Sequence, residues 1–218
     1  MAKILASYDV RSPELGRSLK IDVVEGLDPV HLDHIEQAWT PLFKSQRDKA
    51  VLEYFTELAE VEQTHAAFVT ILGRMGIPDS HWDWRLKCTF APGTQRQAYG
   101  LLNGDQVEAA MMLASGHQTR LGNLGEPLVY VDFLSTAPWN RATIQRPERF
   151  RGMGTMLLGT AVEISRLQGL EGRCGLHALP SAEGFYRRTG MQDLGADPAY
   201  MDLHYFEIDA ATARALIS

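Results

Sequence analysis

The sequence predicts a single α/β domain, and three features of the chain indicate this class. Short apolar runs alternate with longer stretches whose apolar residues recur at helical spacing. The dipeptide Asn103-Gly104 separates two strand-like runs, as in a β-hairpin. A glycine-containing segment at residues 149–155 directly precedes an apolar-striped helix. A length of 218 residues suits one domain with a sizeable core, so we expect one domain over residues 1–218.

The N-terminal part, residues 1–97, is predicted to contain one strand and two helices. Residues 18–26 alternate apolar and polar side chains as a strand does. Asp28-Pro29 supplies an N-cap and a first-turn proline for a helix that ends near residue 42. The tetrapeptide Ser45-Gln46-Arg47-Asp48 resembles a capping box, which predicts a second, long helix that ends near residue 76. Residues 79–87 fit either a short helix or a loop.

The C-terminal part, residues 98–208, carries a clearer pattern. The runs 98–102 and 106–113 flank Asn103-Gly104, which favours a type I′ turn because both central residues need positive φ. After a glycine-rich loop at 116–127, the pattern predicts strands at 128–134, 175–180 and 200–208 and helices at 156–165 and 181–188.

The most informative segment is the loop before the helix at 156–165. Its two glycines, Gly152 and Gly154, let the backbone approach a ligand closely. The amides that follow lie at a helix start, where unpaired N–H groups and the positive end of the helix dipole favour an anion. The segment therefore predicts a cradle for a pyrophosphate.

The order of strand, Arg-x-x-Gly-x-Gly loop, helix, strand and a helix with Ala-x-x-Phe-Tyr-x-x-x-Gly closely resembles the GNAT family of acetyl-CoA-dependent N-acyltransferases. The resemblance covers residues 98–208 specifically and the N-terminal part loosely. It implies the GNAT fold, with a mixed, mostly antiparallel, twisted sheet of six to seven strands flanked by helices. It also implies that 98–208 form the acetyl-CoA-binding core and that 1–97 lie on the acceptor side.

The same resemblance implies a set of site residues. The pyrophosphate of coenzyme A is expected at the loop formed by Arg149, Phe150, Arg151, Gly152, Met153, Gly154 and Thr155. Main-chain groups of Leu134, Ser135 and Thr136 are expected to contact the acyl carbonyl and the pantetheine. Tyr186 matches the acid that protonates the departing thiolate, and Asp132 takes the position of a general base that acts through water. Acetyl-CoA is thus the expected cosubstrate, and no metal is expected.

Several of these residues also have a structural interpretation. Asp132 would otherwise pair with an arginine or make a strand-end hydrogen bond, and Tyr186 would otherwise be a core aromatic. Glu207 and His204 are secondary base candidates for which a salt bridge or a surface position is favoured. The basic cluster Arg141, Arg146, Arg149 and Arg151 suits phosphates or, alternatively, is solvated or salt-bridged. His31 and His34 are expected at the surface or in capping, and Trp82, Trp84 and Trp139 in an acceptor pocket or in packing.

Two departures from the family pattern stand out. Residues 139–148 form an insertion before the loop, and Pro138-Trp139-Asn140-Arg141 resembles a poorly characterised bacterial branch of the family. Leu179 occupies a position where many members have an asparagine that contacts the cofactor; His177 or Ser181 are candidates to replace it.

Composition narrows the function further. A net charge of −6 disfavours broad nucleic-acid or anionic-membrane binding, and the absence of a signal-like N-terminus or a membrane span predicts a cytoplasmic protein. Cys88 and Cys174 are expected to be reduced. The leading hypothesis is transfer of an acetyl group to a primary amine of a small molecule or peptide by direct attack in a ternary complex. The alternatives are a non-catalytic acyl-CoA-binding regulatory module and a toxin-like aminoacyl-tRNA acetyltransferase. A homodimer stays open because homodimers are common in the family.

Overall fold

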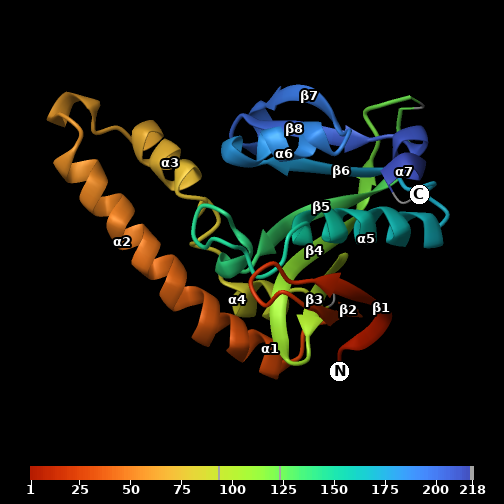
Figure 1. Ribbon diagram of the computed structural model, residues 1–218. Helices are drawn as coiled ribbons and strands as arrows, with labels where there is room; N and C mark the ends of the chain where they lie inside the picture. The colour runs from red at the N-terminus through yellow and green to blue at the C-terminus, as the bar shows by residue number, and fades with distance from the viewer. Residues whose placement is uncertain (93, 123, 217–218) are drawn as a thin grey trace.

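One twisted, mixed sheet organises the chain in the computed structural model, which describes residues 1–92, 94–122 and 124–216 (Figure 1). The sheet has eight strands in the order β1-β2-β3-β4-β5-β6-β8-β7. Every neighbouring pair is antiparallel except β5 and β6, which are parallel. The strands are β1 Lys3–Arg11, β2 Ser18–Glu25, β3 Arg96–Asn103, β4 Gln106–Gln118, β5 Pro127–Thr136, β6 Cys174–Ala178, β7 Gln192–Asp197 and β8 Leu203–Ile208.

The strands that the sequence pattern did not mark are those at the sheet edges, β1 and β7. Most residues of β1 are exposed, so this strand lacks the half-buried alternation that marks a strand in sequence. β7 is interrupted by Gly195 and begins and ends with polar residues. β8 starts at Leu203 rather than at residue 200, because Pro198–Tyr200 form a 3-10 turn. The mixed, mostly antiparallel sheet flanked by helices is confirmed.

The hairpin at Asn103 is confirmed, but its turn differs from the prediction. Asn103 pairs with Gln106, so the two central residues are Gly104 and Asp105. Gly104 has φ +61°, whereas Asp105 does not have a positive φ. One positive φ at the first central position is the pattern of a type II′ turn, which places glycine there. The predicted type I′ turn, centred one residue earlier, is therefore wrong. β4 also runs on to Gln118, and residue 123 of the predicted loop 116–127 lies outside the described residues.

The helices are α1 Pro29–His34, α2 Thr40–Thr56, α3 His65–Arg74, α4 Trp84–Thr89, α5 Met153–Leu167, α6 Glu183–Arg188 and α7 Ala210–Leu216. A π-helical segment, Ile35–Trp39, joins α1 to α2 without a break. Ser45 therefore lies inside a helix, and the predicted boundary there is wrong because no glycine or proline follows Pro41 before the end of α2. The chain turns at 57–64 instead, where the Thr64 hydroxyl accepts from Ala67 N and caps α3.

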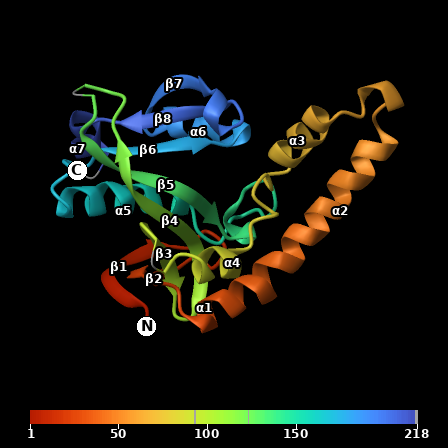
Figure 2. The same ribbon diagram turned by 180° about the vertical axis from the view of Figure 1, so that it is seen from behind.

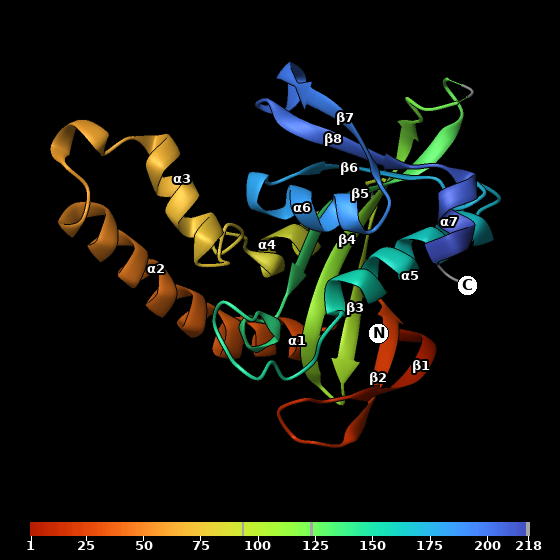
Figure 3. The ribbon, with the colours of Figure 1, turned by 45° about the horizontal axis from the view of Figure 1, so that its top comes forward.

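The α2–α3 hairpin extends away from the sheet, and α3 returns toward the body of the protein (Figure 2). The sheet itself is covered on both faces. On one face, α5 packs its apolar side against the central strands, with α6 on the same side (Figure 3). On the other face lies a second core cluster that includes Trp39, Phe43, Ile77 and Trp84. β2 pairs directly with β3, so the regions 1–97 and 98–208 share this one sheet; residues 217–218 lie outside the description.

Candidate active site

The parallel strands β5 and β6 pair only at their beginnings and then separate. Val129 pairs with Cys174 and Tyr130 with Gly175, and no later pair is formed within the described residues. Two cavities open at this separation. One, of about 570 Å³, is lined by the start of α5 and is called the glycine-loop cleft. The other, of about 500 Å³, is lined by Trp82, Tyr130, Phe133 and Tyr200 and is called the aromatic pocket. Both cavities are lined by Leu134, Leu179, Ala182 and Tyr186, so they meet there.

The glycine-loop cleft has the geometry of an anion site at its α5 end. Gly152 caps the helix with φ +78° and ψ 9°, a left-handed conformation that favours glycine. A Cβ at Gly152 would meet nothing within 4 Å, so the backbone is open to a ligand. The N–H groups of Met153, Gly154 and Thr155 lie in the first helical turn, where they have no intrahelical acceptor. These groups and the helix dipole suit a phosphate.

The residues before Gly152 hold the loop in place. The side chains of Phe150 and Met153 are buried in the core beneath α5. Arg149 reaches the β3–β4 turn, where its Nη2 donates to Gln106 Oε1 over 2.6 Å. Arg151 pairs with Glu148, and its side chain is 70% exposed. Of the predicted loop residues, 152–155 line the glycine-loop cleft and Arg151 is next to them in the chain. Arg149 and Phe150 do not line the cleft and support the loop from behind.

The insertion at 139–148 is anchored on a buried carboxylate. Trp139 Nε1 and Asn140 Nδ2 donate to Glu108 Oε2 over 2.6 and 2.9 Å. Arg149 Nε lies 3.4 Å from Glu108 Oε1 as an ion pair, a separation too long for a good hydrogen bond. Asn140 Oδ1 in turn accepts from Phe150 N over 2.8 Å. The Trp-Asn pair thus links β4 to the segment that leads into the glycine loop.

A second buried network lines the cleft beside the loop. Arg141 donates from both terminal nitrogens to Asp79, over 2.6 and 2.7 Å. The Ser135 hydroxyl donates to Asp79 Oδ2 over 2.5 Å, and the Thr136 carbonyl accepts from Arg141. Burial acts to raise the pKa of the Asp79 carboxyl, but Arg141 and Ser135 together hold it below its ordinary value. Arg141 is therefore salt-bridged, and the prediction that it contacts phosphates is not supported.

Arg188 is a cleft residue that sequence reasoning missed. It lies at the end of α6, lines the glycine-loop cleft and is exposed. No described carboxylate lies within salt-bridge distance of it, in contrast to Arg141 and Arg151. Its position two residues after Tyr186, in the Ala-x-x-Phe-Tyr helix, is the signal that was available in the sequence.

Tyr186 lies where the two cavities meet. Its side chain is 7% exposed and contacts Phe206 and Phe185. Its hydroxyl has no hydrogen-bond partner in the described part of the chain. Burial, and secondly the charge of Asp79, raise the pKa of the phenol. The phenol is thus kept protonated in a residue that lines both cavities, and its ring also packs in the core.

Asp132 lies on the wall of the aromatic pocket, two residues before Leu134. Its Oδ2 accepts from Arg96 Nε over 2.6 Å, so it has the arginine partner that the sequence left open. Tyr130 and His177 also line this pocket: Tyr130 Oη lies 2.7 Å from His177 Nδ1, and His177 Nε2 lies 3.1 Å from Asp197 Oδ2. Burial is the main cause that lowers the pKa of His177. This Tyr-His-Asp chain combines residues from β5, β6 and β7, so no sequence spacing marked it.

The remaining candidates have structural partners. Glu207 is fully buried and accepts from Arg120 N and Thr119, while His204 contacts Asp193; neither lines the two cavities. Glu183, Asp193 and His204 lie close enough to share a cation, but Arg187 already pairs with both acids.

The two histidines of α1 and the tryptophans have different environments. His31 Nδ1 accepts from Asp28 N, which is a capping role, and His34 Nδ1 accepts from Val107 N. Trp82 lines the aromatic pocket, whereas Trp84 and Trp139 pack in or against the second core cluster.

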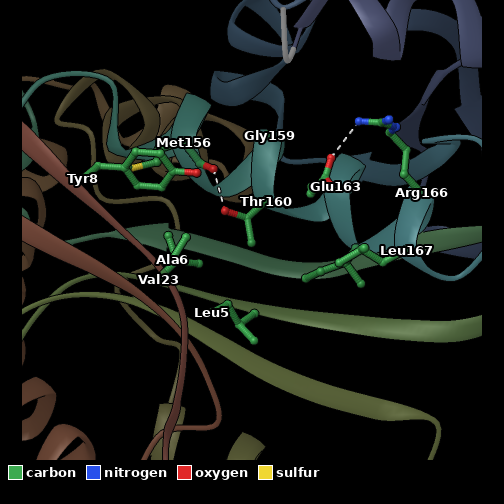
Figure 4. Close-up of a pocket in the computed structure, with 11 residues that line it drawn as sticks. Leu5, Ala6, Tyr8, Val23, Met156, Gly159, Thr160, Glu163, Arg166 and Leu167 are labelled. Atoms are coloured by element: carbon green, nitrogen blue, oxygen red, sulfur yellow. Dashed lines mark hydrogen bonds and ion pairs between the residues drawn. The ribbon is translucent and has the colours of Figure 1, made fainter.

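A larger cavity of about 630 Å³ lies elsewhere, between β1 and α5 (Figure 4). Leu5, Tyr8, Met156 and Leu167 make up much of its wall. The Thr160 hydroxyl is bonded to Met156 O, and Glu163 is paired with Arg166. This cavity shares no lining residue with the other two, and it contains none of the residues of the glycine loop, so the candidate site lies at β5 and β6.

Comparison with known proteins identifies the fold. No protein-family model matches the chain, and no curated protein does. FeeM, an N-acyl amino acid synthase from uncultured soil microbes, aligns with a TM-score of 0.50 at 12% identity over 90% of this chain and 93% of its own. PaiA N-acetyltransferase from Thermoplasma acidophilum, in complex with coenzyme A, aligns at 0.47 and 13% identity over 86% and 97%. A protein from Desulfovibrio desulfuricans described as an acetyltransferase of the GNAT family aligns at 0.46 and 12% identity over 87% and 99%.

The architecture is therefore a mixed α+β sheet that separates between two parallel strands. The chain has the GNAT fold, as its sequence motifs implied. Among the described helices, none is long and apolar enough to cross a bilayer.

Proposed function

We propose that this protein is an acetyl-CoA-dependent N-acyltransferase that transfers an acetyl group to a primary amine by direct attack in a ternary complex. The observation that carries the proposal is the junction at Tyr186, a protonated phenol whose residue lines both a phosphate-type cradle and a separate pocket. A ternary mechanism needs this arrangement, because donor and acceptor must enter by different routes and meet at one atom.

The glycine-loop cleft suits coenzyme A. The N–H groups of residues 152–155 would hold the pyrophosphate, and the exposed cations Arg151 and Arg188 would face its phosphates. Phe150 and Arg149 would act from behind by fixing the loop. Leu134, Ser135 and Thr136 lie along the cleft on the free part of β5, where main-chain groups would guide the pantetheine toward Tyr186. The Thr136 carbonyl already accepts a hydrogen bond from Arg141.

The reaction then follows from the groups at the junction. The amine nitrogen attacks the thioester carbon, and Asp132 takes the proton that the nitrogen loses, through an intervening water. The carbon–sulfur bond breaks, and the thiolate takes the proton of the Tyr186 hydroxyl. The proton balance is closed when Asp132 releases its proton to solvent and Tyr186 regains one. Asp132 and Leu134 both line the aromatic pocket, and a β-bulge between Val131 and Phe133 interrupts the side-chain alternation of β5 at Asp132. Asp132 would act from this wall through the intervening water.

Two measurements test the proposal. Acetyl-CoA should raise the melting temperature of the protein and bind in calorimetry. A panel of primary amines should then release free thiol from acetyl-CoA at rates that depend on the amine. Binding without thiol release for any amine would instead indicate a regulatory acyl-CoA-binding module. Binding of aminoacyl-tRNA at moderate salt would favour the toxin-like alternative. If acetyl-CoA does not bind, the proposal is wrong.

A further inference from the structure

The aromatic pocket contains a cation with no carboxylate partner. Lys87 lies on α4, and its Nζ stands 3.2 Å from the centroid of the Phe133 ring and 5.4 Å from that of Trp82. These contacts hold the ammonium against aromatic faces. No described carboxylate lies within salt-bridge distance of it, whereas most arginines of the described chain are paired. The pKa of the Lys87 amine is lowered, mainly because burial removes part of the water around the ammonium.

The two acids nearest to Lys87 are engaged elsewhere. Asp132 Oδ2 is bonded to Arg96, and Asp83 Oδ1 accepts from Leu86 N as the cap of α4. Both nevertheless act electrostatically on Lys87, with Asp132 the stronger of the two. Asp132 directly precedes Phe133, whose ring carries the Lys87 ammonium, so a carboxylate and an ammonium line the same wall of the pocket.

The rest of the pocket is mainly apolar. Side chains that complete its wall include Trp82, Leu86, Val131, Phe133, Leu176 and Leu203. An unpaired ammonium is costly in such surroundings unless a ligand supplies the opposite charge. The ligand that fits this wall combines an anionic group with an apolar body.

Resting on the function proposed above, we propose that the acceptor is an apolar or aromatic α-amino acid. Its carboxylate pairs with the Lys87 ammonium, its amine faces Asp132, and its side chain lies among the apolar residues of the pocket. One carbon separates the amine and carboxylate of an α-amino acid, which matches an acid and a cation that are neighbours on the wall. From Asp132 the amine is directed toward Leu134 and Tyr186, where the pocket meets the glycine-loop cleft.

The proposal is tested by pairing a change in the protein with a change in the acceptor. L-Phenylalanine and phenethylamine differ only in the carboxylate, so their KM values isolate its contribution. For the wild-type protein we expect L-phenylalanine to have a KM lower by about tenfold or more, the effect of a hydrogen bond to a charged group. Lys87→Met should remove this difference by raising the KM of L-phenylalanine while leaving that of phenethylamine nearly unchanged. Lys87→Arg, which keeps the charge, should retain part of it.

The matched control is Lys49→Met, which removes the same charge from an exposed position on α2. It should leave both KM values unchanged. A readout independent of turnover is the equilibrium binding of N-acetyl-L-phenylalanine and N-acetylphenethylamine, measured by calorimetry. Only the first should bind more weakly to Lys87→Met than to the wild-type protein.

The outcomes separate this inference from the function on which it rests. If phenethylamine is acetylated as well as L-phenylalanine, or if Lys87→Met weakens both acceptors equally, the amino acid assignment is wrong and the acyltransferase proposal stands. If acetyl-CoA fails to bind, both are wrong. Preference for L-phenylalanine that disappears in Lys87→Met and persists in Lys49→Met supports both.

Discussion

The indole Nε1 of Trp139 donates a hydrogen bond to Glu108 Oε2 over 2.6 Å, which fastens the insertion at 139–148 to β4. Asn140 extends this link, since it donates to the same carboxylate and accepts from the main chain of Phe150. The conformation of the glycine loop thus depends on a carboxylate more than forty residues earlier in the chain. The insertion acts here as a support for the loop.

Asn140→Ala should destabilise the protein by about 1–3 kcal/mol, because the Glu108 carboxylate and the Phe150 N–H each lose the hydrogen bond that Asn140 makes with them. Urea unfolding measures this change. Acetyl-CoA affinity should fall as well, since the Phe150 main chain loses its fixed position just before Gly152. Arg146→Ala, an exposed change in the same insertion, should alter stability by no more than about 0.5 kcal/mol. Equal losses in the two variants would show that Asn140 does not support the loop.

Glu108 makes a pH-dependent contribution of predictable sign. Burial, the largest cause, raises the pKa of its carboxyl above the ordinary 4.5, although Trp139 and Arg149 oppose the shift. A raised pKa in the folded state gives a contribution that is present below about pH 4.5 and is lost as the pH rises through the folded value. The variant Glu108→Gln has no carboxyl at this position, so its stability does not fall with rising pH for this reason. The unfolding free energy of the variant relative to the wild-type protein should therefore increase from pH 4 to pH 7, and a constant difference would contradict the shift.

The hairpin, the glycine loop and the strands around it could be predicted because each rests on local chemistry. Gly152 and Gly104 mark positive φ, and apolar runs mark buried strands. The edge strands β1 and β7 could not be predicted, because an edge strand with little burial has no alternating pattern. The helix boundary predicted at Ser45 was wrong, because a capping tetrapeptide has no effect inside an uninterrupted helix. The chain turn at 57–64, between α2 and α3, was not predicted.

Gly152→Ala tests the cradle directly. The residue has φ +78°, and the space that an added methyl group would occupy is open, so the cost arises from the backbone alone and should be about 1–2 kcal/mol. Acetyl-CoA binding should weaken further, because relief of the strain moves the first-turn N–H groups. Gly159→Ala lies on the same helix, also with nothing within 4 Å of its Cβ, and should be neutral or stabilising by up to about 1 kcal/mol. The cradle is not the binding element if both variants bind acetyl-CoA like the wild-type protein.

Asp79→Asn should be strongly destabilising, because it leaves the Arg141 guanidinium buried without its counter-charge. Removing one partner of a buried pair costs about 3–5 kcal/mol. The folded pKa of Asp79 lies below its ordinary 3.8, so this contribution is present above pH 3.8 and is lost as the pH falls through the folded value. The difference between the wild-type protein and the variant should shrink below pH 3.8. The double variant Asp79→Asn/Arg141→Met should be more stable than the sum of the two single changes implies.

In the candidate site, as in the fold, residues that belong to local motifs differ from residues that only the folded chain brings together. Tyr186 and the glycine loop belong to sequence motifs, and the structure brings the two motifs to one cleft. The Asp79–Arg141 pair and the Tyr130–His177–Asp197 chain could not be predicted, because each joins residues from separate elements that only the folded sheet brings together. A charged residue in a sequence does not reveal its partner. Arg141 and Arg188 look equivalent in the sequence, yet one is buried in an ion pair and the other lines the cleft.

Tyr186→Phe removes one oxygen at the junction of the two cavities and leaves the ring to pack against Phe206. Acetyl-CoA affinity should stay within about twofold of the wild-type value, because the hydroxyl bonds no described residue and, in the proposed function, serves the leaving sulfur only during reaction. Loss of a general acid typically slows turnover by about 10²–10⁴-fold, so kcat should fall while KM changes little. Because burial raises the pKa of this phenol above 10, the wild-type rate should show no loss from its ionisation up to about pH 10. Unchanged kcat in Tyr186→Phe would assign the ring to packing alone and leave the thiolate to be protonated by water.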